Sequence, residues 1–260
     1  MDAPAVCRRY ARRRPAWYHP LWAEVSSLAE RRGRRMTRDQ YDQPVQTYVD
    51  AEALIDDPQV LARRIVDNDE PLVDIGNFPT LAIDNNRTCV QKLSDNPFKV
   101  RSGVADRLTR AQAYLPDGYQ LQIKEGWRPI WVQERLWQES LEQLRASRSD
   151  LADEELRREN TRFTAPPDSA PPHSTGGAVD IILLRHGEYA DMGWGFNQPG
   201  EGSRTGHPVS RAARCNRDLL ADAMDAAGFI NYPAEWWHWS YGDRYWAFQT
   251  AHEAALYGPR

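Results

Sequence analysis

The sequence predicts an α+β domain in which helices flank a largely antiparallel central sheet. Helical and strand-like segments are mixed along the chain without the strict alternation of a parallel βαβ fold. Residues 119–125 alternate apolar and polar side chains, as a strand with one buried face does. Residues 210–227 instead carry apolar side chains at helical spacing. The 260 residues can bury a full core as one domain with an extension.

The first part of the chain is expected to form an Arg-rich helical extension, residues 1–45, before a domain of residues 46–260. Apolar side chains recur there at helical intervals and predict a helix that ends near Gly33: Trp17, Trp22, Val25 and Leu28. Its apolar stripe would pack on the domain or on another subunit. A homo-oligomer therefore remains open.

The elements up to residue 172 follow from local patterns. Proline suits a first helical turn, so a helix is expected from Pro58 through Val66. Short strands (72–75, 81–84), a helix capped by Ser102 (102–115), the alternating strand (119–125) and a helix (131–145) follow. The long, charged connection 147–172 has a possible helix at 153–160. A connection of that length is often the rim or lid of a site.

The C-terminal part contains the most apolar strand and the clearest helix. A buried strand is expected at 178–184, followed by a Gly-rich stretch over 186–208. The helix at 210–227 should close at Gly228, a residue that tolerates the left-handed cap. Two last strands are expected at 229–232 and 236–241.

Two short segments supply a candidate catalytic centre, His173-Ser-Thr-Gly-Gly-Ala-Val-Asp180 and Glu235-Trp-Trp-His-Trp239. A catalytic zinc takes three protein ligands and keeps a fourth position open for water. His173, Asp180 and His238 meet that requirement, which predicts one Zn²⁺ per chain. Glu235 is then free to act as a general base on the water.

Three motifs together resemble the D-alanyl-D-alanine dipeptidases, zinc metallopeptidases related to the D,D-carboxypeptidases and the Hedgehog signalling domain. They are Gly-Trp-Arg128-Pro, His-x-x-Gly-x-Ala-x-Asp from His173, and Glu-x-Trp-His-Trp from Glu235. The similarity runs from about Leu72 to Ala247. It implies a Hedgehog/D,D-peptidase-like zinc fold and hydrolysis of a D-Ala-D-Ala type dipeptide. For Arg128 it implies stabilisation of the carbonyl oxyanion, although a tethering salt bridge would also explain this arginine.

The substrate-selecting residues depart from the family pattern. The family usually has Ser two places before the first histidine, where this chain has Pro171, and an aspartate for the substrate ammonium, where this chain has Asn197. Its Asp-Leu-Arg-Tyr motif is only loosely matched by Asp84-Asn-Asn-Arg87. The candidate substrate-binding residues are Arg87, Asn197, His207 and Trp237.

These departures leave three functions open. The first is the D-Ala-D-Ala type dipeptidase, with a small peptide as the partner. The second keeps the hydrolysis but acts on a different small amide or dipeptide, in specialised metabolism or cell-wall turnover. The third is a zinc-bearing interaction module without turnover, which has no need for Glu235 or Arg128.

Composition limits the remaining partners. The net charge of −4 does not indicate nucleic-acid binding by the whole chain, although the arginines at 8–14 and 31–38 could form a binding arm. No apolar run reaches the length of about 18 residues that a membrane span needs. The N-terminus lacks the apolar stretch of a secretory signal. Three cysteines suit free thiols in a reducing compartment, so we expect a cytoplasmic protein.

Overall fold

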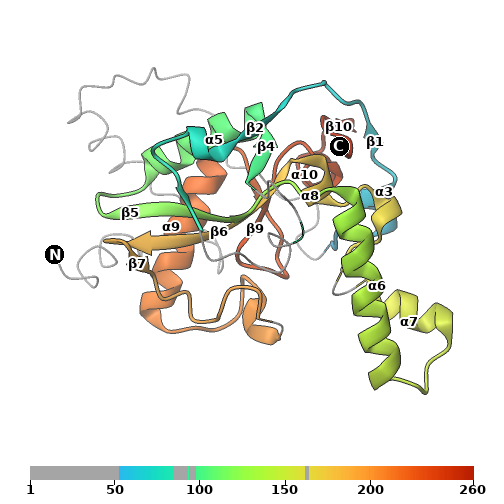
Figure 1. Ribbon diagram of the computed structural model, residues 1–260. Helices are drawn as coiled ribbons and strands as arrows, with labels where there is room; N and C mark the ends of the chain where they lie inside the picture. The colour runs from blue at the N-terminus through green and yellow to red at the C-terminus, as the bar shows by residue number, and fades with distance from the viewer. Residues whose placement is uncertain (1–52, 85–92, 94–97, 162–163, 199) are drawn as a thin grey trace.

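The computed structural model describes residues 53–84, 93, 98–161, 164–198 and 200–260 (Figure 1). The predicted Arg-rich extension over residues 1–45, with its helix, lies outside the described residues. The division into an extension and a domain from residue 46 therefore stays a prediction. Helices and strands are mixed along the described chain, as the sequence predicts.

A six-stranded sheet forms the centre, with the strand order β3-β5-β6-β9-β8 and β7 beside β6. Its strands are β3 (Ala82–Ile83), β5 (Tyr119–Glu125), β6 (Ala178–Arg185), β7 (Glu188–Tyr189), β8 (Ile230–Asn231) and β9 (His238–Ser240). β3 and β5 run parallel, whereas the other pairs in this sheet run antiparallel. The sheet is therefore mixed. The chain passes through helix α5 (Ser102–Tyr114) between β3 and β5, and such a crossover makes a parallel pair possible.

Strand β6 is the central strand of this sheet. It pairs with β5 along one edge and with β9 along the other, so that Asp180 lies opposite both Glu125 and His238. All its residues except Arg185 are buried. A strand covered on both faces needs a continuous apolar run, which explains the sequence from Ile181 to Leu184.

Helices α5 and α9 (Arg211–Ala226) pack against each other. Their apolar residues, including Val104, Leu108, Leu220 and Ala223, lie in one core cluster with those of β5 and β6. Ser210 caps α9 by accepting from the backbone N–H of Ala213. The two helices therefore pack against the central strands and support them. Both helices begin and end close to the predicted boundaries.

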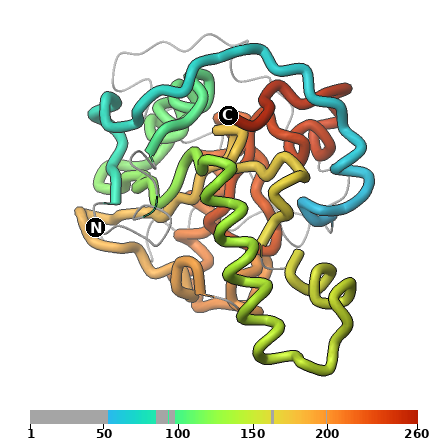
Figure 2. The backbone as a smooth tube through the Cα atoms, turned by 45° about the vertical axis from the view of Figure 1, so that its right-hand side comes forward, coloured from blue at the N-terminus to red at the C-terminus, as the bar shows by residue number. Residues whose placement is uncertain are grey.

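Helices α6 (Ile130–Ser147) and α7 (Asp153–Asn160) form an arm that projects from the body of the molecule (Figures 1 and 2). Inside the arm, the Asn160 side chain donates to the backbone carbonyl of Trp137 and accepts from the Ser140 hydroxyl. Leu141 and Leu156 are buried. The helix expected at 153–160 in the long connection is thus present, and it packs on the preceding helix.

Shorter elements surround the sheet. They are α3 (Pro58–Leu61), β1 (Arg64–Ile65), β2 (Leu72–Asp74), η2 (Ile75–Asn77), β4 (Lys99–Arg101), η3 (Pro167–Ser169), α8 (Pro172–Thr175), η4 (Glu201–Ser203), α10 (Arg244–Gln249) and β10 (Ala254–Ala255). The helix predicted from Pro58 through Val66 ends at Leu61, because Arg64 and Ile65 pair in parallel with β10 near the C-terminus. A tertiary contact overrides the local pattern there.

Two findings bear on the predicted compartment. Cys215 on α9 forms a disulfide bond, so the expectation that the cysteines are free thiols was wrong for this residue. In the described ranges, no helix combines the length and the apolar character needed to cross a membrane. The cytoplasmic location loses one of its supports and stays a prediction.

One buried arginine, Arg101, joins three separate parts of the chain near α8. Arg101 on β4 has a fully buried side chain. Its Nε donates to the carbonyl of Thr175 at 2.8 Å, and its Nη2 donates to the carbonyl of Gly258 and to Asp67 Oδ2, both at 2.8 Å. Burial raises the pKa of Asp67, but these contacts outweigh it, so the pKa lies below its ordinary value. Because Thr175 ends α8, Arg101 anchors the helix that carries His173.

We predict that Arg101→Met lowers the free energy of unfolding by about 3–5 kcal/mol, because it leaves Asp67 and buried carbonyls without their cation. The control Arg135→Met removes an exposed pair with Glu139 on α6 and should cost less than about 0.5 kcal/mol. Denaturant unfolding measures both. Equal effects of the two variants would contradict the anchoring role of Arg101.

Candidate metal centre and active site

Three buried side chains from different elements meet at the sheet: His173 of α8, Asp180 of β6 and His238 of β9. Their candidate ligand atoms all lie within 4.8 Å of one another. Asp180 Oδ1 lies 3.3 Å from His173 Nε2 and 3.1 Å from His238 Nδ1. The structure therefore brings together the His-Asp-His group that the sequence predicts as metal ligands.

The turn after His173 needs both glycines. Gly176 ends α8 with a φ of 74°, in the left-handed region. A Cβ on Gly176 would lie 2.6 Å from the Leu72 side chain, and one on Gly177 would lie 2.5 Å from the carbonyl oxygen of Tyr241. Any other residue would push these neighbours apart and shift His173 relative to β6.

The donor set and its spacing fit zinc. Zinc ligands at 2.0–2.2 Å in a tetrahedron are about 3.4 Å apart, close to the two spacings around Asp180 Oδ1. His173 Nδ1 lies 2.9 Å from the carbonyl oxygen of Gly126. A carbonyl only accepts, so Nδ1 carries the proton and Nε2 is the donor atom for a metal. Two imidazoles and one carboxylate leave a fourth position open, as a catalytic zinc requires.

The charges of the group favour an ionised Asp180. Burial opposes its ionisation, but the charges and hydrogen bonds of His173 and His238 outweigh burial and hold the pKa of Asp180 far below its ordinary range. Burial likewise opposes protonation of His173, yet Asp180 raises the pKa of that imidazole above its usual value. A carboxylate that stays ionised at neutral pH is the form that binds a cation.

Glu235 stands beside this group. Its Oε2 lies 4.0 Å from His238 Nδ1, and its side chain keeps 37% exposure. The backbone is fixed because the N–H of Glu235 donates to Tyr232 and the N–H of His238 donates back to Glu235. Partial burial raises the pKa of the Glu235 carboxyl, while His238 partly opposes the rise. A carboxylate with solvent access and a raised pKa is suited to proton transfer.

Arg128 follows the end of β5 and lies near the same group. Its Nε donates to Glu125 Oε1 at 2.6 Å and its Nη1 donates to Gln133 Oε1 at 2.6 Å. Burial opposes its charge, but Glu125, and then Asp180 and Glu235, raise the pKa of the guanidinium. The salt bridge considered as an alternative is therefore present. It leaves Nη2 without a hydrogen bond to any residue that the structure describes.

The four predicted substrate-binding residues have different positions. Arg87 lies outside the described residues. Asn197 is exposed with a φ of 53°, and His207 is partly exposed with its ring 6.1 Å from that of Trp194. Trp237 is buried in the core against Phe196, with 5.5 Å between the ring centroids. Their contact with a substrate stays a prediction.

The residues that support the centre were not predicted from the sequence. Glu125 and Gln133 hold Arg128, and the Tyr232 ring lies edge-on to His238 at 5.8 Å. Asp84, from the segment that loosely matches the family motif, forms a buried ion pair with Lys124 of β5. Of these residues, Glu125 could have been predicted as a partner of Arg128, because it is a carboxylate at the end of a half-buried strand and lies three residues before the arginine.

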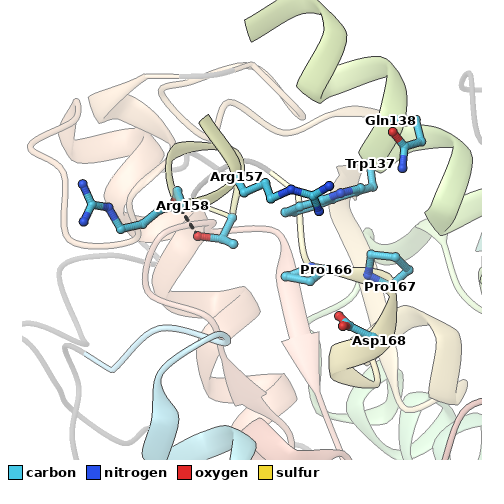
Figure 3. Close-up of a pocket in the computed structure, with 8 residues that line it drawn as sticks. Trp137, Gln138, Arg157, Arg158, Pro166, Pro167 and Asp168 are labelled. Atoms are coloured by element: carbon cyan, nitrogen blue, oxygen red, sulfur yellow. Dashed lines mark hydrogen bonds between the residues drawn. The ribbon is translucent and has the colours of Figure 1, made fainter. Parts of the chain in front are cut away.

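A hollow of about 460 Å³ lies on the arm, between α6, α7 and the start of η3 (Figure 3). It is lined by Trp137, Gln138, Arg157, Arg158, Thr161, Pro166, Pro167 and Asp168. Trp137 follows Gln133, the residue that accepts from Arg128, by one turn of α6. None of the predicted site residues lines this hollow.

Comparison with known proteins places this arrangement in a family. Residues 82–254, well over half of the chain, match the family described as D-Ala-D-Ala dipeptidase, peptidase M15. The chain belongs to this family. The match spans the arginine motif, the His-Asp-His group and Glu235, so the predicted class of enzyme, a metallopeptidase, is confirmed.

Related proteins match this chain at moderate sequence identity. A D-alanyl-D-alanine dipeptidase of Synechocystis sp. is 32% identical over 59% of this chain and 73% of its own length. One of Escherichia coli is 29% identical over 62% of this chain and 79% of its own length. A zinc-bound VanY D,D-pentapeptidase from a VanB-type vancomycin resistance cassette covers 70% of this chain and 88% of its own, with 16% identity and a TM-score of 0.36.

We predict that Asp180→Asn abolishes stable zinc binding, with an affinity loss above ~10²-fold, because replacing a residue that only contacts a metal ligand already costs 10–100-fold. Zinc added to the wild-type protein should raise its Tm, since the ion binds the folded state, and should not do so in this variant. Asp153→Asn on α7, an exposed change, is the control. Competition with a chelator measures the affinity. Tight zinc binding by Asp180→Asn would contradict the assignment.

Proposed function

We propose that this protein is a zinc-dependent dipeptidase that hydrolyses a small D-amino-acid dipeptide of the D-Ala-D-Ala type, on a Hedgehog/D,D-peptidase-like zinc fold. One observation carries the proposal: His173, Asp180 and His238 converge, and Glu235 stands 4.0 Å from His238 with access to solvent. Family membership supports the same substrate class. His173 Nε2, an oxygen of Asp180 and His238 Nδ1 would hold one zinc ion.

The residues of the chain divide the chemistry among them. Zinc, when bound, supplies Lewis acidity that activates water and polarises the amide carbonyl. Glu235 takes a proton from the attacking water and delivers it to the leaving amine. Arg128 Nη2 donates to the carbonyl oxygen as negative charge develops there. Arg128 therefore acts at the carbonyl oxygen, whereas Glu235 acts at the water and at the leaving nitrogen.

The burial of the site strengthens these interactions. Asp180, His173 and His238 are buried, and charges interact more strongly where water is excluded. The carboxylates of Glu125, and then of Asp180 and Glu235, raise the pKa of Arg128. The guanidinium therefore stays charged throughout turnover and can meet a developing anion without any reorganisation.

A second candidate is the same hydrolysis on a different small amide or dipeptide. Asn197 supports it, because a neutral amide at the ammonium subsite would lose a charged hydrogen bond of about 1.5–3 kcal/mol. The third possibility, an interaction module without turnover, is disfavoured by the solvent access of Glu235 and by the donor left on Arg128. A homo-oligomer and a cytoplasmic location stay predictions.

Replacement of the base tests the mechanism. Glu235→Gln keeps the shape of the side chain but cannot accept the proton, so kcat should fall by ~10²-fold or more while bound zinc stays unchanged. In the wild-type protein, kcat/KM should fall as the pH drops through the raised pKa of Glu235, because protonation removes the base. Glu188→Gln, exposed on β7, is the control. Undiminished hydrolysis by zinc-loaded Glu235→Gln would refute the role of this carboxylate.

Restoring the family's charge tests the substrate. Asn197→Asp should raise kcat/KM for dipeptides with a free amino group by ~10-fold, which corresponds to the charged hydrogen bond regained. N-acylated dipeptides, which lack the ammonium, are the matched control and should not improve. If free and acylated dipeptides respond alike, Asn197 does not occupy the ammonium subsite.

A further inference from the structure

The guanidinium of Arg128 is held at two of its three nitrogens by two buried side chains. Glu125 Oε1 accepts from Nε, and Gln133 Oε1 accepts from Nη1, each at 2.6 Å. Glu125 is 5% exposed and Gln133 is 1% exposed. Hydrogen bonds to two different nitrogens of a planar group fix both its position and its plane. The third nitrogen, Nη2, is left for another partner.

Gln133 uses both ends of its amide. Its Oε1 accepts from Arg128, and its Nε2 donates to the carbonyl of Ala165 at 2.7 Å. Arginine only donates and a backbone carbonyl only accepts, so only one orientation of the amide satisfies both neighbours. The amide is thus locked, and it links the first turns of α6 to the segment that precedes α8.

That segment leads to the metal centre. From Ala165 the chain runs through η3 to α8, where the carbonyl of His173 accepts from the backbone N–H of Arg128 at 3.1 Å. His173 Nδ1 in turn contacts the carbonyl of Gly126 at 2.9 Å. The arginine is therefore joined to the His173 segment twice, once through its backbone and once through the Gln133 amide.

We propose that Gln133 is a positioning residue for hydrolysis: it sets the direction of Arg128 Nη2 and ties it to the segment that carries His173. The inference rests on the proposed function, in which Arg128 stabilises the oxyanion. Glu125 alone would hold the guanidinium by one hydrogen bond and leave its plane free to rotate. Misdirection of one oxyanion donor slows the chemical step and leaves ground-state binding nearly unchanged.

The first experiment measures kcat and KM for D-Ala-D-Ala with three variants. Gln133→Met keeps the length of the side chain and removes both hydrogen bonds, so kcat should fall by ~10–10²-fold with KM within about 3-fold. Gln133→Glu keeps an acceptor for Arg128 and should retain a kcat between that of Gln133→Met and the wild type. Gln138→Met makes the same chemical change at an exposed position of α6 and should match the wild type. Bound zinc and Tm are recorded for each variant.

A wild-type kcat in Gln133→Met overturns the inference. A fall that Gln133→Glu does not relieve at all, or that accompanies loss of zinc, also overturns it, because the residue would then act on the fold or the metal.

A double-mutant cycle tests whether Gln133 acts on the rate through Arg128 or independently of it. If Gln133 acts through Arg128, Gln133→Met should change the rate of Arg128→Ala by less than about 2-fold. The same 10–10²-fold loss in both backgrounds would overturn the inference.

The outcomes also separate this inference from the proposed function. If Arg128→Ala slows hydrolysis and Gln133→Met does not, only the role of Gln133 fails. If D-Ala-D-Ala is not cleaved by the zinc-loaded wild type, or Arg128→Ala leaves cleavage unchanged, the proposed function fails at its substrate or at its oxyanion arginine, and the role of Gln133 falls with it.

Discussion

The register of β6 between its two neighbours is the constraint on which the centre depends. Asp180 lies opposite His238 on β9 and opposite Glu125 on β5, which holds Arg128. Side chains of a strand alternate between faces, so a slip of one residue would turn Asp180 away from both partners. The close packing of the buried residues around it opposes that slip, because side chains of different shape would have to exchange places. The hydrophobic core thus fixes the geometry of polar groups.

The second constraint is charge balance in a buried space. Asp180 lies between two imidazoles, and Glu125 lies against Arg128, so each buried carboxylate has a cationic or proton-donating neighbour. Burial alone would neutralise these groups, whereas the paired arrangement keeps Asp180 and Arg128 charged. Arg101 likewise supplies a buried positive charge to Asp67 and so balances the charge of the segments around α8. The centre is therefore assembled and ionised before any substrate arrives.

The sequence predicted what depends on local pattern and failed where distant segments decide. The apolar run of β6 and the alternation of β5 are local signals, and the metal-binding group followed from residue types that zinc requires. Gln133 was not predictable, because its role depends on the carbonyl of Ala165, 32 residues away. The parallel pairing of β3 and the disulfide of Cys215 also depend on tertiary contacts. No element was predicted over α10, whose aromatic residues are common in strands as well.

The release of D-alanine from D-Ala-D-Ala by the purified protein, with and without a chelator, tests the central claim most directly. A zinc-dependent dipeptidase should contain about one zinc per chain, lose its activity when the ion is removed and regain it when zinc alone is returned. Hydrolysis that persists in the metal-free protein would contradict the account. So would a zinc-loaded protein that cleaves no dipeptide.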